Sequence, residues 1–304
     1  MATIHVLHEN DAWTAPLELA LQHQGLPYQM WHLAHGILDL AQEAPDGVFY
    51  SRMSASSHTR GHRYAPELTG AVLAWLERSG RRVLNGTQAL RLELRKVAQY
   101  EALRQHGILS PRTVAAVGRE NILAAAESFA GRRFITKHNR AGKGLGVRLF
   151  ENADDLRHHL DSAEFEPSVD GITLVQEYIE APEPFITRVE FIGGAFLYAV
   201  RVDTSEGFEL CPADVCATDS LTPKFQIIDG FEHELLPRYQ QFLNANGVDV
   251  GALEFIVSKD GTAYTYDVNT NTNYNPEAEE VAGISGMPAL ARFLGEELAA
   301  IASG

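Results

Sequence analysis

Short apolar runs alternate with stretches of helical periodicity in the first part of the chain. The elements that this pattern predicts are, in chain order, strand 3–8, helix 14–25, strand 27–33, strand 47–52 and helix 66–79. Pro16 near the beginning of the first helix and Gly25 at its end are typical start and stop residues. Strand, helix and strand in this order indicate a parallel sheet with helices on its faces. We therefore expect residues 1–88 to form an α/β domain.

The rest of the chain has the pattern of an α+β protein. The expected elements are, in chain order, helix 90–106, an extended segment from 110, helix 122–129, strands 133–137 and 146–150, helix 153–160, strand 172–179, hairpin 185–202, helix 230–246, hairpin 251–269 and helix 288–300. The segment 181–184, Ala-Pro-Glu-Pro, interrupts the pattern. We divide this part into a central domain at 89–179 and a C-terminal domain at 180–304.

The chain of 304 residues is acidic, with 25 Lys and Arg against 40 Asp and Glu and a net charge of −15. Such a chain repels a phosphate backbone, so nucleic acid is not an expected partner, whereas a small basic site for a phosphorylated ligand is compatible with it. No apolar run approaches the roughly 18 residues that suggest a membrane-spanning helix. The N-terminus does not have the pattern of a secretory leader. We expect a cytoplasmic protein with no membrane partner.

The most informative pattern lies in the last expected hairpin, where Asp260-Gly261 is a strong signal for a two-residue turn. That turn places Glu254 opposite Asp267, with Asn269 on the same face and opposed Cβ atoms about 5 Å apart. The other face would be apolar, formed by Leu253, Phe255, Val257, Tyr264, Tyr266 and Val268. Opposed carboxylates repel each other unless a cation lies between them, and three oxygen ligands suit Mg²⁺ with a substrate phosphate. The alternative is a solvent-facing strand pair with incidental acids.

A glycine-rich loop follows Lys137, which ends a predicted strand. Gly142, Gly144 and Gly146 alternate with other residues, among them Lys143, and can bring backbone N–H groups close to anionic oxygens. The spacing matches neither the P-loop nor the dinucleotide-binding fingerprint. One interpretation is a phosphate-binding loop assisted by the Lys137 ammonium, and the other is an ordinary turn.

The hairpin at 185–202 turns at Gly193-Gly194, which places Arg188, Glu190 and Arg201 on one face. Two neighbouring arginines require an anion or an acidic partner. One interpretation is a structural ion pair with Glu190. The other is a clamp on a transferring phosphoryl group, for which the guanidinium fork is suited.

A basic loop follows the third strand of the N-terminal domain and contains Arg52, Ser54, Arg60 and Arg63. Loops at the carboxyl ends of parallel strands form ligand sites. The loop is therefore a candidate for binding a substrate carboxylate, and the alternative is a solvated basic loop.

These motifs, in this order, resemble the ATP-grasp superfamily over residues 1–295. The resemblance is to the branch that contains glutathione synthetase, D-alanine–D-alanine ligase and the RimK-type glutamate ligases. Its most specific part is Glu254 followed by Asp267-Val268-Asn269 and the tail Thr-Asn-Thr-Asn-Tyr at 270–274. The resemblance implies an N-terminal parallel-sheet pre-ATP-grasp domain, a central lid subdomain with the glycine loop, and a C-terminal antiparallel-sheet domain with the metal site.

For the nucleotide, the resemblance implies that Lys96 and Lys137 contact the phosphates and that the loop 142–146 closes over them. The residues that it places beside the adenine are Gln176, Glu177, Tyr178 and Ile179. The ribose hydroxyls would bind Glu183 or Glu180, and the resemblance does not choose between them.

For the metal, the resemblance implies two Mg²⁺ ions, or Mn²⁺ in their place, on Glu254, Asp267 and Asn269. It also implies contacts of Arg188 and Arg201 with an acyl phosphate. The tail residues that would contact the second substrate are Asn271, Asn273 and Tyr274. This chain departs from the family pattern at three places: His138 and Asp267 stand where Pro and Glu are common, and the tail replaces Pro-Gly.

The implied activity is ATP-dependent ligation of a carboxylate to an amine through an acyl phosphate, with Lys137, Arg188 and Arg201 acting on the transferring group. The alternatives are a phosphotransferase that stops at a phosphorylated product and a nucleotide-binding module without turnover. The expected partners are small-molecule or peptide substrates, such as an amino acid or a short peptide. Because relatives commonly self-associate, a homo-oligomer is a further expectation.

Overall fold

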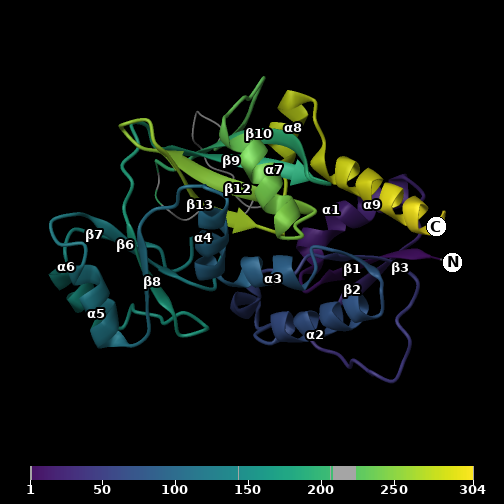
Figure 1. Cartoon of the computed structure of the whole chain (residues 1–304), viewed down its shortest axis with the longest axis horizontal. Coiled ribbons are helices and arrows are strands. Elements are labelled where there is room, and N and C mark those ends of the chain that lie inside the picture. The colour runs from purple at the N-terminus through teal and green to yellow at the C-terminus, as the bar shows by residue number, and fades with distance from the viewer. Residues whose placement is uncertain (1, 143, 206, 208–223, 304) are drawn as a thin grey trace.

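The computed structural model describes residues 2–142, 144–205, 207 and 224–303, which fold around three β-sheets (Figure 1). In the figure, the N-terminal sheet lies on the same side of the molecule as the C-terminal helix, and the small central sheet lies at the other end. Within the described ranges, no helix is both long and apolar enough to cross a membrane. The glycine-loop residue Lys143 lies outside the described residues.

The N-terminal domain contains the predicted parallel sheet. Its strands, in spatial order, are β2 (Tyr28–His32), β1 (Thr3–His8), β3 (Gly47–Ser51) and β4 (Arg82–Leu84). The helical elements after β1 and β3 are α1 (Asp11–His23), the short 3-10 helix η1 (Ser57–Arg60) and α2 (Ala65–Arg78). Helix α1 begins three residues earlier than predicted, because the Asn10 side chain accepts a hydrogen bond from the Trp13 N–H and caps the helix.

The predicted helix at 90–106 is wrong as a single element. It is two helices, α3 (Thr87–Leu94) and α4 (Lys96–Gln105), separated by Arg95 in an extended conformation. Asn139 holds the break open, because its carbonyl accepts from the Lys96 N–H at 3.1 Å and its side-chain oxygen accepts from the Val97 N–H at 3.0 Å. As a result, Lys96 is the first residue of a helix.

The central domain is a small antiparallel sheet covered by two helices. The strand order is β5 (Thr113–Ala116), β8 (Thr173–Glu177), β6 (Phe134–His138) and β7 (Arg148–Phe150). The helices α5 (Arg119–Glu127) and α6 (Ala153–Leu160) share a core with the strands that includes Phe129, Phe134 and Phe150. This core is separate from the others.

The C-terminal sheet is antiparallel and has five strands. Their spatial order is β11 (Phe225–Ile228), β10 (Ala195–Asp203), β9 (Phe185–Ile192), β12 (Val250–Val257) and β13 (Ala263–Asn269). The helices of this part are α7 (Leu235–Ala245), α8 (Pro276–Ala282) and α9 (Gly286–Ala302). Leu290 and Leu294 of α9 share a core with Leu17 and Leu21 of α1, so the last helix joins the C-terminal sheet to the N-terminal domain (Figure 1).

A bulge corrects the predicted register of the first hairpin. Near the turn Ile192 pairs with Ala195, as expected, but the register shifts between Phe196 and Tyr198. Beyond the shift Arg201 pairs with Thr187. Because one residue of slip moves a side chain to the opposite face, Arg201 does not share a face with Arg188.

The second hairpin contains two deviations that cancel. Its turn is longer than predicted, since the Ser258 N–H donates to the Thr262 carbonyl at 2.9 Å, and Val257 pairs with Ala263. A bulge between Glu254 and Phe255 then shifts the register back by one residue. Glu254 therefore lies opposite Asp267, as predicted, whereas the predicted apolar face is wrong at Tyr264 and Tyr266.

Candidate functional site

A cavity of about 660 Å³ lies between the central sheet, α4 and the C-terminal sheet. Many residues that the sequence singled out line it, from all three parts of the chain. They are Ser54, Lys96, Lys137, Gly142, Gly144, Gln176, Glu177, Tyr178, Ile179, Glu183, Arg188, Glu254, Asp267, Asn269, Asn271, Asn273 and Tyr274. The fold thus brings together positions that are far apart in the sequence.

Two carboxylates face each other on the floor of the cavity. Glu254 of β12 lies opposite Asp267 of β13, and the Asn269 side-chain amide donates to Glu254 at 3.3 Å. Lys96 donates to Asp267 at 2.5 Å, and Arg188 donates to Glu254 at 2.9 Å. Burial raises the pKa of Glu254, Arg188 opposes the rise, and Asp267 adds to it. Two cations, Lys96 and Arg188, therefore pair with the opposed acids.

The charges around the cavity favour additional cations. The acidic residues that line it are Glu93, Glu177, Glu183, Glu190, Glu254 and Asp267. The basic ones among the described residues are Lys96, Lys137 and Arg188. Carboxylate and amide oxygens on Glu254, Asp267 and Asn269 are ligands that Mg²⁺ prefers. The donor set thus fits a divalent cation whose remaining ligands are water and phosphate.

Lys137 is a buried cation beside the two acids. Its ammonium lies 5.1 Å from the centre of the Tyr100 ring and 5.7 Å from that of Tyr266, and it donates to the Tyr266 carbonyl at 3.5 Å. Burial, with the nearby charge of Lys96, lowers the pKa of Lys137 to about 7. An anionic ligand in the cavity would favour the charged form of this side chain.

Arg188 is held in place by a polar network on β9. Its Nε donates to Glu190 at 2.5 Å and its Nη2 donates to the Thr272 hydroxyl at 2.6 Å. The Thr272 hydroxyl in turn donates to Glu190 at 2.7 Å. Burial alone would lower the pKa of Arg188, but Glu190 and Glu254 raise it above its ordinary value. The structural ion pair with Glu190 is present, and the same guanidinium lines the cavity.

The glycine loop adopts a conformation that requires glycine. Gly142 and Gly144 line the cavity, and Gly146 lies where the loop turns into β7. Gly146 has a φ of 73°, and a Cβ there would lie 2.6 Å from the His138 ring. Residues with a side chain rarely adopt this φ, and the His138 ring leaves no space for a Cβ. Only glycine therefore fits at position 146 unless the ring moves.

The far end of the cavity has an apolar wall that the sequence analysis missed. The wall is formed by Ile135, Leu149, Ile186, Val200 and Ile256. These side chains come from five strands of two sheets, so their grouping depends on how the sheets pack. The sequence offered one signal for this wall: the alternation of inward and outward side chains along each strand.

The residues that the resemblance places beside the adenine also line the cavity. Gln176 and Glu177 end β8 and line the cavity with Tyr178 and Ile179. Of the two acids that the sequence left open, Glu183 lines the cavity, whereas Glu180 pairs with Lys259 at 2.5 Å and is not part of the lining.

Arg201 does not reach the cavity, in contrast to the prediction. The bulge in β10 turns it to the other face, where it donates to Glu183 at 2.8 Å and its guanidinium lies 3.9 Å from the centre of the Phe185 ring. The prediction that Arg188 and Arg201 share a face is therefore wrong.

The three arginines of the basic loop also differ from their predicted grouping. Arg52 is buried and donates to the Trp13 carbonyl and the Asn273 side chain, so it anchors the tail after β13. Arg60 pairs with Glu9 at 2.5 Å. Arg63 pairs with Glu67 and donates to the Val169 carbonyl. None of the three lines the cavity, so a joint carboxylate site is not formed; of the loop residues predicted to bind substrate, only Ser54 lines it.

Sequence reasoning also missed several polar and aromatic lining residues. Tyr266 lines the cavity because the bulge in β13 turns it there. Glu93 of α3 accepts from the backbone N–H groups of Ala55 and Thr270, and burial raises its pKa. Trp13 of α1 also lines the cavity. None of these positions belongs to a local motif, so only the packed structure places them at the site.

Comparison with solved structures identifies the architecture. The structure of a RimK-domain ATP-grasp protein from Sphaerobacter thermophilus superposes with a TM-score of 0.66 and 19% identity, and the match covers 96% of this chain and 99% of that one. The chain has the ATP-grasp fold. The ATP-grasp ligase PsnB, in a complex with a minimal precursor, Mg and ADP, has the same fold, with a TM-score of 0.66, 16% identity and 97% coverage of both chains.

Sequence comparison points the same way. Beta-citrylglutamate synthase B from Danio rerio is 23% identical over 206 residues, which are 67% of this chain and 48% of that protein. This chain therefore spans about half the length of that curated relative. No family model matches the sequence. The predicted ATP-grasp architecture is confirmed at the level of the fold.

Proposed function

We propose that this protein is an ATP-dependent carboxylate–amine ligase. The observation that carries the proposal is the opposed pair Glu254 and Asp267 in one cavity with three cations, Lys96, Lys137 and Arg188. An ATP-grasp fold around such a pair suits a nucleotide whose phosphates bind through divalent cations. The names of the similar proteins, which include a synthase and a ligase, support the same class of reaction.

The geometry suggests how the nucleotide binds. Its base would lie against the apolar wall near Gln176–Ile179, and Glu183 would accept from the ribose hydroxyls. Its phosphates would extend toward Lys96 and Lys137, beneath Gly142 and Gly144. Lys96 now pairs with Asp267, and binding of phosphate would replace part of that interaction.

Glu254, Asp267 and Asn269 would hold Mg²⁺, or Mn²⁺ in its place. The bound ions would neutralise charge on the phosphates as the phosphoryl group transfers. In this proposal two ions share these ligands, which is the number that the resemblance to the ATP-grasp superfamily implies.

The reaction would proceed in two steps. A substrate carboxylate oxygen attacks the γ-phosphorus of ATP, the bond to the β-phosphate oxygen breaks, and an acyl phosphate and ADP form. An amine then attacks the acyl carbon, loses a proton and expels phosphate, leaving an amide. Arg188, fixed by Glu190 and Thr272, would stabilise negative charge on the transferring group. Exclusion of water by the glycine loop would protect the acyl phosphate.

The second substrate would bind beside the tail after β13. Asn271, Asn273 and Tyr274 line the cavity there, and Arg52 fixes the tail through Asn273. Another PsnB structure contains a precursor peptide, which supports a peptide or an amino acid as the substrate class here. The excess of carboxylates in the lining favours a substrate that carries a positive charge.

Hydroxylamine trapping tests the proposal. The protein is incubated with ATP, Mg²⁺, hydroxylamine and a panel of amino acids and short peptides, and we expect an ATP-dependent hydroxamate together with ADP. A stable phosphoester in place of the hydroxamate would show a phosphotransferase. The absence of any thermal shift with ATP and Mg²⁺ would contradict nucleotide binding altogether.

A further inference from the structure

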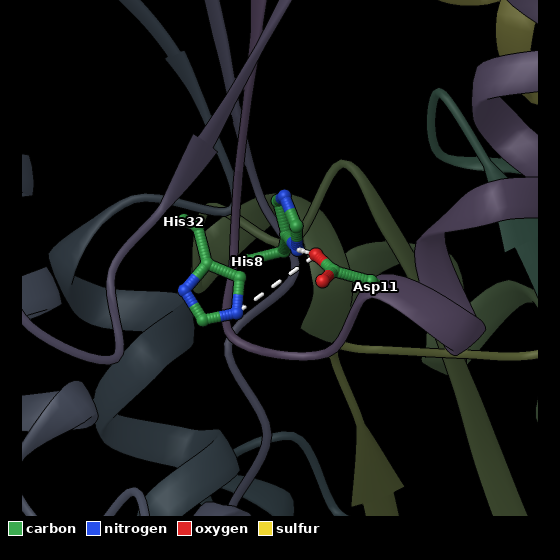
Figure 2. A group of neighbouring side chains, drawn as sticks. All are labelled: His8, Asp11 and His32. Atoms are coloured by element: carbon green, nitrogen blue, oxygen red, sulfur yellow. Dashed lines mark ion pairs between the residues drawn. The ribbon is translucent and has the colours of Figure 1, made fainter.

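A second group of metal-ligating side chains lies in the N-terminal domain, away from the cavity. His8 ends β1, His32 ends β2, and Asp11 is the first residue of α1 (Figure 2). One ligand atom of each lies within 4.8 Å of the others. None of the three lines the cavity described above. The group therefore needs an explanation of its own.

The distances resemble those of an open metal site. Asp11 Oδ1 lies 3.7 Å from His8 Nδ1 and 3.8 Å from His32 Nε2, and Figure 2 shows both imidazoles turned toward that carboxylate. Both distances exceed those of a normal hydrogen bond. Ligand atoms in a tetrahedral zinc site, each about 2.0–2.2 Å from the ion, lie roughly 3.3–3.6 Å apart. The two distances to Asp11 exceed this range by a few tenths of an ångström, and the His8 and His32 nitrogens lie within 4.8 Å of each other, so an inward movement of the exposed His32 and Asp11 side chains would close the three atoms around an ion.

His8 provides an independent reason to expect a ligand. Its side chain is 4% exposed, and neither ring nitrogen has a hydrogen-bond partner of normal geometry among the described residues. Buried polar atoms without partners are rare because the lost hydration is not replaced. The ring points toward Asp11, whose side chain is 84% exposed, and His32 is 36% exposed. The group thus has one buried histidine and two ligands that are exposed to solvent.

A further histidine lies beside the group and already has an oriented ring. The His62 ring centre lies 5.7 Å from that of His32, and His62 Nδ1 lies 2.8 Å from Glu9 Oε2. Glu9 is itself held by Arg60 at 2.5 Å, so the charge of that arginine is neutralised locally. A carboxylate that fixes one imidazole nitrogen is a common arrangement behind metal-binding histidines. His62 is therefore a neighbour of the site through its contact with His32.

We propose that His8, Asp11 and His32 form a binding site for a transition-metal ion of the zinc class, with three protein ligands and an open position facing solvent. Two imidazoles and one carboxylate suit Zn²⁺ or Co²⁺ far better than Mg²⁺, which prefers oxygen ligands. The site is chemically distinct from the oxygen-rich pair Glu254 and Asp267. It occupies the carboxyl edge of the parallel sheet, the edge at which such sheets bind ligands.

Co²⁺ titration of the tag-free, chelator-treated full chain tests the proposal. Nitrogen ligands in a four- or five-coordinate site give Co²⁺ much stronger visible absorption than oxygen ligands in an octahedral one. In the presence of millimolar Mg²⁺ and without nucleotide, we expect one equivalent of Co²⁺ to bind with strong absorption and Zn²⁺ to displace it. Asp11→Asn and His32→Gln are each expected to weaken Co²⁺ binding at least 30-fold.

The matched control is His23→Gln, which removes an exposed histidine from the same helix as Asp11 and should leave Co²⁺ affinity unchanged. Since the Asp11 and His32 side chains are partly or largely exposed, both variants should fold, and circular dichroism verifies this. Absence of strong absorption in the natural protein would overturn the proposal. Equal Co²⁺ affinity in the natural protein and in Asp11→Asn and His32→Gln would also overturn it.

Discussion

At the scale of single residues, Lys137 links nucleotide binding to pH. With a pKa of about 7 it is mostly neutral at pH 8.5 in the free protein, and a phosphate nearby would raise that pKa. Binding of ADP with Mg²⁺ at pH 8.5 is therefore expected to take up close to one proton. Calorimetry in buffers of different ionisation enthalpy measures this uptake.

The control for this measurement is Lys137→Arg, which keeps a cation whose charge does not change near pH 8.5. Its proton uptake should fall toward zero while nucleotide still binds. Equal uptake in both proteins would show that another group carries the proton.

Glu254 is the residue on which the metal proposal depends most directly. Glu254→Gln keeps the length of the side chain and removes its charge, so Mg²⁺ loses an anionic ligand. We expect kcat for ADP formation to fall by about 100-fold or more. Glu180→Gln removes an acid that does not line the cavity and should stay within about twofold of the natural protein in a side-by-side steady-state assay.

At the scale of elements, the bulge in β10 separates two arginines that the sequence placed together. Arg188 faces the cavity and Arg201 faces away from it. We expect Arg188→Ala to lower kcat by about 100-fold or more, because a fixed cation near the transferring group is lost. Arg201→Ala should change kcat by less than about threefold, because Arg201 does not line the cavity and its ion pair with Glu183 is exposed to solvent. A larger effect of Arg201→Ala than of Arg188→Ala would contradict this placement.

The predicted pairing of Glu254 with Asp267 is correct, although it rested on only one of the two features that produce it. Asp260-Gly261 correctly signals a reversal, but the reversal is one residue longer than expected, which alone would separate Glu254 from Asp267. The bulge near Tyr266 restores the pairing and brings that tyrosine into the cavity. Bulges are determined by packing against neighbouring strands, so the local sequence does not reveal them.

At the scale of the whole molecule, Asn85 connects the N-terminal domain to the strands that carry the metal ligands. Its amide donates to the carbonyls of Val250 and Thr270, and its oxygen accepts from the N–H groups of Asp249 and Val250. The side chain is 1% exposed. Asn85→Ala is therefore expected to lower the free energy of unfolding by about 3 kcal/mol, because buried backbone groups lose their partners.

Urea denaturation at equilibrium measures this change. Asn85 has a φ of 53°, so Asn85→Gly tests whether the cost comes from the backbone or from the lost hydrogen bonds. We expect Asn85→Gly to remain strongly destabilised. Asn121→Ala, which removes an exposed hydrogen bond from α5 to the Val117 carbonyl just before that helix, should change the free energy of unfolding by less than about 0.5 kcal/mol. A small effect of Asn85→Ala would mean that the two parts are held together mainly by the core around α9.

Across these scales, the parallel sheet, the glycine loop and the pair Glu254 and Asp267 could be predicted, since each depends on local periodicity or on a short motif. The break at Arg95 could not, because Asn139, which follows β6 and is distant in sequence, holds it open. The grouping of Arg52, Arg60 and Arg63 was wrong for a related reason. A positively charged loop predicts an anion, but Arg60 pairs with buried Glu9, and Arg52 and Arg63 donate to carbonyls of other segments.

The amino-acid sequence by itself determined the order of the elements, the turns that reverse the chain and the acids that pair across one hairpin. These features follow from interactions between residues close in sequence, where backbone geometry limits the alternatives. The tertiary structure decided which side chains enter the cavity, which arginines are neutralised, and that His8, Asp11 and His32 converge at one edge of a sheet. Such outcomes depend on distant segments packing together, and a single slip in register turns a side chain from one face to the other.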